Sequence, residues 1–231
     1  MYLRALPFLV GAALLLGGCA GASYTVDRPD GDYDLEAMAL VDDDMPTGYL
    51  ERNSHVYDNQ AWAEFVDQEN PEAKQRQLDA LGRVSGATKV FGQDNPGEHL
   101  GHAYLLVAQS TLYTSVSAAQ KSLKKFCDVA VDEKDPTEEF KVTGVGDEAS
   151  GFQSTSQVNN FGDSIDTVVC FRTGRIVHAV ITSGLDGTQD VALVVKLAKK
   201  MLARVDAAFD AIGSGKAKAT EVPAKSPTPR R

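Results

Sequence analysis

The longest regular pattern of apolar residues lies near the end of the chain. Between residues 191 and 212, apolar side chains recur at intervals of three and four, while Lys196, Lys199, Lys200 and Arg204 fall off that stripe. This spacing places the apolar side chains on one face of an α-helix. Gly213-Ser214-Gly215 is typical of a helix end. The pattern therefore predicts a six-turn amphipathic helix with one buried face.

A different period precedes this helix. Residues 167–172 and 175–182 alternate in character around Thr173-Gly174, which predicts a β-hairpin. A two-residue loop would place Val168, Cys170, Val177 and Ala179 on one face. The other face would carry Val169, Phe171, Ile176, His178 and Val180. Because both faces are largely apolar, the hairpin is expected at the centre of a sheet that is covered on both sides.

The rest of the chain predicts further strands and helices. Apolar periodicity and turn residues favour strands at 37–41, 84–91, 99–114, 140–145 and 149–158. Helices are predicted at 59–69, at 71–82 after an Asn70 cap, and from Ser117, which forms a capping-box pattern with Gln120. This order of elements predicts an α+β fold, an antiparallel sheet with amphipathic helices packed on one face.

The N-terminus has the composition of an export signal. Arg4 precedes an uncharged, mostly apolar run of 14 residues, 5–18, which is shorter than the roughly 20 residues of a membrane-spanning helix. The run ends in Leu16-Gly17-Gly18-Cys19, which resembles the lipobox of bacterial lipoproteins. The resemblance implies removal of residues 1–18 as a signal peptide and lipid attachment to the Cys19 thiol. The alternatives are an ordinary signal peptide with a chance cysteine and a buried N-terminal helix.

Composition suggests the domain organisation of the remaining chain. Residues 19–35 are predicted to be a flexible acidic tether, 36–213 a single soluble α+β domain, and 214–231 a disordered basic tail. The net charge of −9 argues against nucleic acid as a partner, because phosphate binding requires a basic surface.

Two cysteines remain after Cys19. Cys127 lies on the apolar stripe of the helix predicted from Ser117, and Cys170 lies on the hairpin face with the smaller side chains. Both positions suit one helix–sheet interface, and an exported protein meets oxidising conditions. A Cys127–Cys170 disulfide is therefore predicted, with two reduced, buried cysteines as the alternative.

Several patterns resemble reactive sites without matching them fully. Ser122-x-x-Lys125 and Arg172-Thr173-Gly174 echo penicillin-binding enzymes, but the two motifs are close in sequence and a third is missing. His99 and His102 would point to opposite faces of a strand. No catalytic residue, metal site or cofactor is predicted. The turn 144–148 either lines a cleft or is simply solvated.

The functional prediction combines these observations. The Val145-Gly146-Asp147-Glu148 turn, the hairpin and the closing helix resemble small actinobacterial envelope lipoproteins and extracellular sensor modules. This resemblance implies a lipid-anchored protein on the extracytoplasmic face of a bacterial membrane, with a non-catalytic binding or sensing domain. Its partner would be an envelope protein, a wall polymer or a small molecule. A small envelope hydrolase or transpeptidase-like enzyme is the alternative.

Overall fold

The computed structural model describes residue 24 and residues 28–95, 101–129, 137–158 and 162–215. The predicted signal peptide, Cys19 and nearly all of the basic tail lie outside these ranges, as do the side chains of residues 124–129. Within the described ranges, no helix combines the length and the apolarity needed to cross a membrane.

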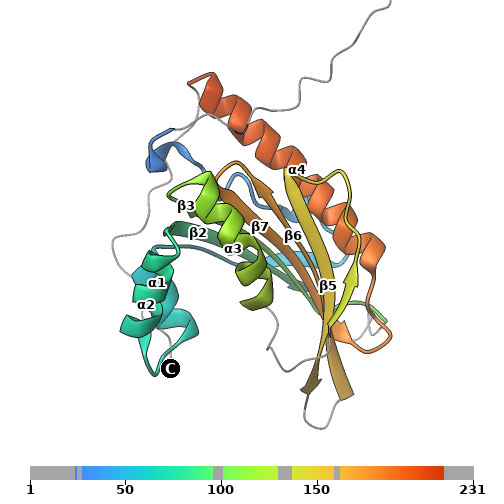
Figure 1. Ribbon diagram of the computed structural model, residues 1–231. Helices are drawn as coiled ribbons and strands as arrows, with labels where there is room; N and C mark the ends of the chain where they lie inside the picture. The colour runs from blue at the N-terminus through green and yellow to red at the C-terminus, as the bar shows by residue number, and fades with distance from the viewer. Residues whose placement is uncertain (1–23, 25–27, 96–100, 130–136, 159–161, 216–231) are drawn as a thin grey trace, which may run out of the picture.

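The centre of the fold is a seven-stranded, fully antiparallel sheet in the order β1-β2-β3-β7-β6-β5-β4 (Figure 1). Two meanders, β1–β3 and β4–β7, meet where β3 pairs with β7. The strands are β1 (Tyr49–Tyr57), β2 (Arg83–Gln93), β3 (Leu105–Tyr113), β4 (Thr137–Phe140), β5 (Glu148–Val158), β6 (Gly162–Thr173) and β7 (Ile176–Leu185). The predicted α+β class with an antiparallel sheet is confirmed.

Four α-helices accompany the sheet, and each begins beside a polar side chain. They are α1 (Asn59–Val66), α2 (Pro71–Ala80), α3 (Val116–Val129) and α4 (Val191–Gly213). Asp58, Asn70 and Asp190 cap α1, α2 and α4 by accepting bonds from backbone N–H groups in the first turn. The cap of α3 differs from the prediction, because Ser115 rather than Ser117 accepts from the Ala118 N–H.

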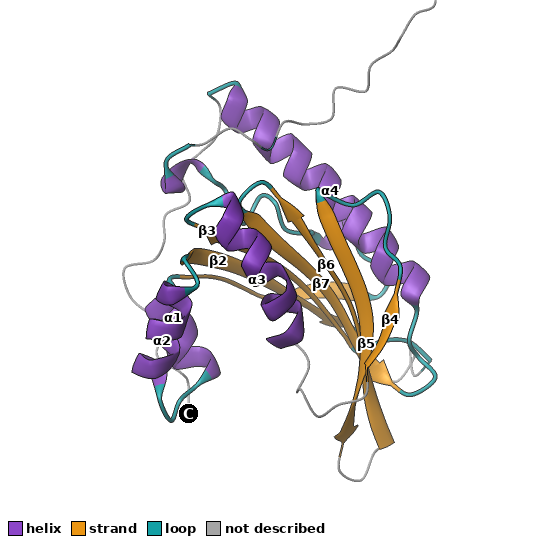
Figure 2. Cartoon of the chain, in the orientation of Figure 1, coloured by secondary structure: helices purple, strands orange, loops and turns teal. Residues whose placement is uncertain are grey.

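The helices lie on both faces of the sheet, which extends the prediction of helices on one face (Figure 2). On the first, which we call the α4 face, α4 buries an apolar stripe against the strands. This core includes Phe91, Leu106, Phe171, Val180, Val194, Leu197 and Met201. On the opposite face, the α3 face, Ala119 and Leu123 of α3 pack against Val168, Cys170, Val177 and Ala179. Strands with two apolar faces need two covers.

The side chains of the central hairpin lie on the predicted faces, but its loop is shifted along the sequence. Thr173 pairs with Ile176, so the two loop residues are Gly174 and Arg175 rather than Thr173 and Gly174. The shift moves the register by two residues. Since side chains alternate with a period of two, each one keeps its predicted face.

One strand was not predicted, and one predicted strand is absent. β1 is a polar edge strand whose sequence YLERNSHVY gives little alternation. Residues 37–41 instead form turns in which Met38 and Leu40 are buried. The apolar side chains of this segment are buried in the core as expected, but its backbone does not pair with a strand of the sheet.

The N-terminal segment also departs from the predicted tether at 19–35. Tyr33 and Leu35 are buried, and Arg175 holds the preceding residues. Its Nη1 donates to Asp30 at 2.6 Å, its Nη2 donates to the Arg28 carbonyl at 2.6 Å, and its guanidinium lies over the Tyr33 ring. Residues 28–35 are therefore part of the folded domain, because these aromatic and apolar side chains cover the end of the sheet.

Candidate binding site on the α3 face

Polar side chains gather on the α3 face of β2 and β3. Thr88 lies directly opposite Gln109, and Thr111 lies opposite Gly86. Their neighbours Ala87, Ala108 and Leu112 belong to the core on the α4 side. Because strand residues alternate between faces, Thr88, Gln109 and Thr111 point to the other side. With Arg83 at the start of β2, we call these four residues the polar cluster.

Arg83 is the charged member of the cluster, and it is 5% exposed. Its Nη1 donates to Asn59 Oδ1 at 2.7 Å, and its guanidinium carbon lies 5.7 Å from the centre of the Trp62 ring. Burial lowers the pKa of Arg83 to about 10, so the side chain stays cationic at neutral pH. The cluster thus contains a positive charge that the protein has largely removed from water.

Four donors of the cluster are buried without a hydrogen-bond partner among the residues that the structure describes. They are Arg83 Nη2, Thr88 Oγ1, Gln109 Nε2 and Thr111 Oγ1. An unsatisfied buried polar group costs about 1–3 kcal/mol, so native proteins keep few of them. Four such groups on two adjacent strands lower the free energy of unfolding of the domain.

Gly86 brings two of these donors together. A β-carbon on Gly86 would lie 2.6 Å from Arg83 Nη2 and 3.4 Å from Thr111 Oγ1. The guanidinium therefore lies directly over the glycine, beside the threonine hydroxyl. Any larger residue at position 86 would push the guanidinium away.

Aromatic residues flank the cluster on the α1 side. Tyr57 of β1 packs edge-on against Trp62 at 5.3 Å between ring centroids, and Phe65 lies 5.7 Å from both rings. Phe65 is 62% exposed, which is unusual for a phenylalanine. On the other side Ser122 of α3 lies by the Tyr113 hydroxyl, whose pKa is raised by burial. The cluster is thus bordered by an aromatic wall and by α3.

The sequence motifs considered for catalysis are not brought together. Ser122 lies on the α3 face, whereas Thr173 belongs to the α4 face and bonds His178 Nε2 at 2.8 Å. His178 Nδ1 also bonds Ser110 Oγ at 2.9 Å, and its ring stacks on Phe171. Burial lowers the pKa of His178 to about 3. Because Ser110, Thr173 and His178 are all 0% exposed, this chain of bonds is structural.

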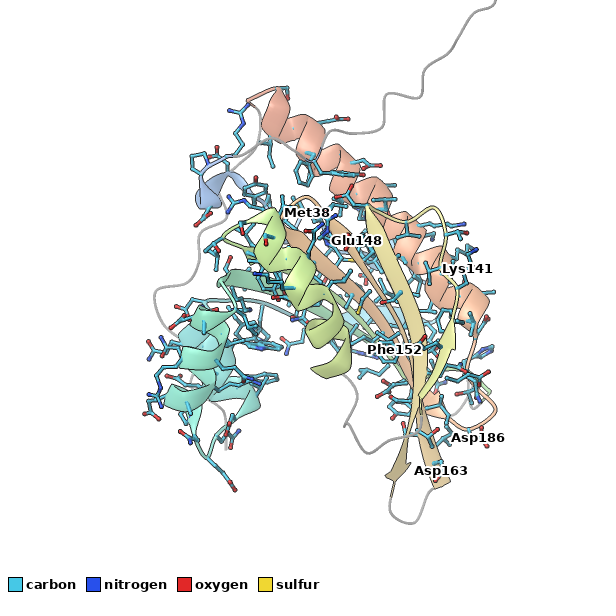
Figure 3. The ribbon with its side chains drawn as sticks, in the orientation of Figure 1. Met38, Lys141, Glu148, Phe152, Asp163 and Asp186 are labelled. Carbon is cyan, nitrogen blue, oxygen red and sulfur yellow. The ribbon has the colours of Figure 1, made fainter. Side chains whose placement is uncertain are left out.

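The 144–148 turn has a structural role as well. Asp147 Oδ2 accepts from Arg172 Nη1 at 2.9 Å and from the Gly174 N–H at 2.8 Å, and Glu148 lies 3.6 Å from Arg172 Nε (Figure 3). A β-carbon on Gly146 would lie 2.5 Å from the Arg172 carbonyl oxygen, and the φ of this glycine is +61°. The turn therefore fastens the central hairpin, a structural role that neither interpretation of the sequence included.

The remaining predicted residues are only partly described. Cys170 is fully buried in the cluster that packs against α3, as predicted. Cys127 belongs to α3, but its side chain lies outside the described residues, so the disulfide stays a prediction. Cys19 and His99 also lie outside, and His102 is exposed. Among the described side chains, no three His, Cys, Asp or Glu residues gather closely enough to hold a metal ion.

Sequence reasoning did not find the polar cluster. Its members come from positions 83, 88, 109 and 111, and only the β2–β3 register joins them. One signal was available, since Gln109, Ser110 and Thr111 are three consecutive polar residues in an otherwise apolar, buried strand. Because side chains alternate between the two faces of a sheet, such a run places buried polar groups on both faces.

Comparison with known proteins gives a likeness of fold. No known protein family matches the sequence, and no characterised protein is similar to it in sequence. The crystal structure of the extracellular domain of PknH from Mycobacterium tuberculosis is similar in fold, with a TM-score of 0.52 and 8% sequence identity. The match covers 79% of this chain and 99% of that domain.

Proposed function

We propose that this chain is a lipid-anchored extracytoplasmic protein whose domain binds a ligand at the polar cluster and catalyses no reaction. The observation that carries the proposal is the set of four buried donors without a partner in the described part of the protein. Groups that cost stability in the unliganded fold gain most when a ligand satisfies them. The fold shared with the extracellular domain of PknH, a domain outside the cell, supports the location.

The chemistry of the cluster favours binding over catalysis. Its members are one arginine, one glutamine and two threonines, and none of these takes up and releases protons near neutral pH. Two histidines lie near the cluster, on opposite faces. His178 is closed to solvent on the α4 face, whereas His55 of β1 lies opposite Thr88, with its ring 5.4 Å from that of Tyr57. The four cluster members themselves are donors that can hold a ligand, and none of them is a nucleophile activated by His55.

The predicted anchor gives the location. Cys19 follows a run too short to span a membrane, and two or three acyl chains hold a protein firmly at a bilayer. We expect metabolic labelling with a fatty acid to mark the wild-type protein and to miss the Cys19→Ala variant. A wild-type protein that carries no acyl label would contradict the anchor. Fractionation alone is insufficient, because an uncut signal can itself hold the variant in the membrane.

Binding is tested by asking what the protein retains during purification. The full-length protein, extracted from membranes in an uncharged detergent, is examined by native mass spectrometry. We expect a bound small molecule on the wild-type protein and its loss from a Thr88→Val/Gln109→Leu variant. Lys89→Gln is the matched control, because Lys89 lies on the same strand but pairs with Glu51 at 3.4 Å. Equal retention by all three proteins would argue against the cluster as the site.

A further inference from the structure

Three arginines in the described domain are buried, and only one of them has no carboxylate within ion-pair distance. Arg172 pairs with Asp147 at 2.9 Å and with Glu148 at 3.6 Å, and Arg175 pairs with Asp30 at 2.6 Å. Arg83 is as deeply buried as Arg172, at 5% exposure each. Its hydrogen bond goes to the amide oxygen of Asn59, whose amide nitrogen donates to Asp79, and Asp58 attracts the guanidinium through space. The fold thus gives two buried guanidinium groups a direct ion pair, whereas the third has only indirect carboxylates.

Removal of a cation from water costs stability unless ion pairs and hydrogen bonds offset the cost. For Arg83 the offset comes from the bond to Asn59, the Trp62 ring and the attraction of Asp58, without a direct ion pair. Its Nη2 stays unsatisfied, which leaves a charged donor that a ligand can use. The guanidinium has a planar fork of donors that matches the oxygens of a carboxylate or a phosphate.

We propose that the polar cluster binds an anionic oxygen group, a carboxylate or a phosphate, with Arg83 Nη2 and Thr111 Oγ1 as donors. This inference rests on the proposed function, since it names the ligand class of the same site. The two donors converge over Gly86, whose missing side chain leaves room for the guanidinium beside the threonine hydroxyl. The charge of Arg83 attracts the anion, and the Thr111 hydroxyl donates a directional hydrogen bond to it.

The rest of the cluster indicates the part of the ligand that lies next to the anion. Thr88 and Gln109 form the next row on the same face, two residues along the strands from Gly86 and Thr111. Two residues of a strand span roughly 7 Å. Their free donors, Oγ1 and Nε2, are neutral and suit hydroxyl or carbonyl oxygens. We therefore expect a small molecule or a lipid headgroup that has an anionic group at one end. Its neutral oxygens would lie about 7 Å from that group, which is roughly the width of a sugar ring.

Access to Arg83 requires a shift of α1. Trp62 covers the guanidinium and Asn59 holds it, and both residues belong to α1. No residue of α1 or α2 belongs to the apolar cores under α4 and α3, and only Ala63 and Leu78 among their apolar residues are buried. Polar and aromatic contacts therefore supply much of the packing of this helical hairpin, and elements with little apolar packing open most readily. Ligand binding at Arg83 must change the surroundings of Trp62.

This geometry supplies a reporter, because Trp62 is the only tryptophan of the chain. Its emission is followed in the full-length protein in an uncharged detergent, at constant ionic strength. The anionic probes are inorganic phosphate, acetate, glycerol 3-phosphate and glucuronate, and the neutral controls are acetamide and glycerol. We expect saturable changes with anions only, and at least tenfold tighter binding of glycerol 3-phosphate or glucuronate than of phosphate or acetate. Vesicles with and without phosphatidylglycerol then distinguish a lipid headgroup from a free ligand.

Variants assign the response to residues. Arg83→Met and Thr111→Val are each expected to weaken the binding of the best anion at least tenfold. Gly86→Ala should do the same, because the added methyl displaces the guanidinium. Gly92→Ala is the matched control: it lies on the same strand, and its methyl would meet Arg52, an exposed arginine. It should bind like wild type. Circular dichroism checks that each variant is folded.

Two results would overturn the inference. One is an anion response that Arg83→Met and Thr111→Val leave unchanged while both variants are folded. The other is a wild-type protein whose Trp62 emission responds to neutral probes as strongly as to anions, or to neither. In both cases a neutral molecule retained in the mass spectrum would leave the binding function standing, and only the ligand class would fail. A wild-type protein that also retains no molecule would reject the function as well.

Discussion

Ser110 and Thr111 are neighbours on β3, both hydroxyl side chains and both fully buried, yet they lie in opposite surroundings. Ser110 points to the α4 face and bonds His178, which also bonds Thr173. Thr111 points to the α3 face, and its hydroxyl has no partner within the described ranges. The difference shows that burial of a polar group does not by itself reveal its role. Whether its hydrogen bonds are satisfied separates a structural group from a binding group.

The two faces of the sheet also differ in how they are covered. α4 is a 23-residue helix with a continuous apolar stripe, and it closes the α4 face along its length. The α3 face is covered in two pieces, by α3 over β3, β6 and β7 and by α1 with α2 beside β2 (Figure 1). The polar cluster lies on β2 and β3, where the two pieces meet. A continuous helix makes a core, whereas a divided cover includes a smaller piece, α1, that can shift to admit a ligand.

The largest expected effect concerns the cover of the α3 face. A Cys127–Cys170 disulfide would close a loop of about 44 residues and stabilise the fold by about 4 kcal/mol in the chain-entropy model. We expect reductant to lower the free energy of unfolding in urea by an amount of this order. The Cys127→Ala variant should be insensitive to reductant. Full reaction of both thiols with a maleimide after non-reducing denaturation would exclude the bond.

The second effect comes from His178 on the α4 face. Burial sets its pKa at about 3, against roughly 6.5 in the unfolded chain. Between pH 6.5 and pH 3, His178 is therefore protonated in the unfolded chain but neutral in the folded protein. Stability should fall by about 1.4 kcal/mol per pH unit from pH 6.5 down to pH 3, or by about 2.7 kcal/mol at pH 4.5, with no contribution above pH 6.5.

The measurement is urea unfolding between pH 7 and pH 4.5 for wild type and His178→Gln. The carboxylates titrate in both proteins, so the difference between the two slopes isolates His178. Parallel pH profiles would show that His178 accepts its proton in the folded state.

The third prediction compares the two hydroxyl neighbours directly. Ser110→Ala leaves a nitrogen of His178 unpaired and should cost about 1–3 kcal/mol. Thr111→Val removes an unsatisfied hydroxyl while keeping the shape, so it should leave stability unchanged or raise it by up to about 1 kcal/mol. Chemical denaturation of both variants gives the comparison. Equal destabilisation would remove the distinction between the two faces.

The smallest effect is expected at the C-terminus. Residues 214–231 contain few apolar residues and come after the end of α4, so their deletion should leave the thermal midpoint nearly unchanged. Differential scanning calorimetry of the shortened chain checks this. A drop of several degrees would mean that the segment packs against the domain.

The sequence predicted the parts of the fold that repeat a simple period. The stripe of α4 and the alternation of β6 and β7 both depend on local spacing, so the helix and the faces of the hairpin were foreseen. The strand β1 was missed because an edge strand with one partner needs few apolar residues. Residues 37–41 were wrongly predicted to be a strand, because their apolar side chains are buried although the backbone forms turns.

The candidate site could not be read from the sequence for a different reason. Arg83 and Thr111 are 28 positions apart, and the register of two strands brings them together over Gly86. A single arginine at the start of a strand gives no sign that its charge will be buried. Its lack of a direct ion pair is visible only after Asp147, Glu148 and Asp30 are found beside other arginines.

The docked N-terminal segment limits how the domain can stand above a membrane. Tyr24 lies over Gly174 at the loop of the central hairpin and donates a hydrogen bond to Asp206 of α4. From Cys19 to Tyr24 the chain spans at most about 18 Å, even fully extended. At the same end of the sheet Arg175 bonds Tyr113, which pairs with Arg83. With lipid on Cys19, this end of the domain would be held close to the bilayer, and the polar cluster would lie at the membrane-proximal end of the sheet.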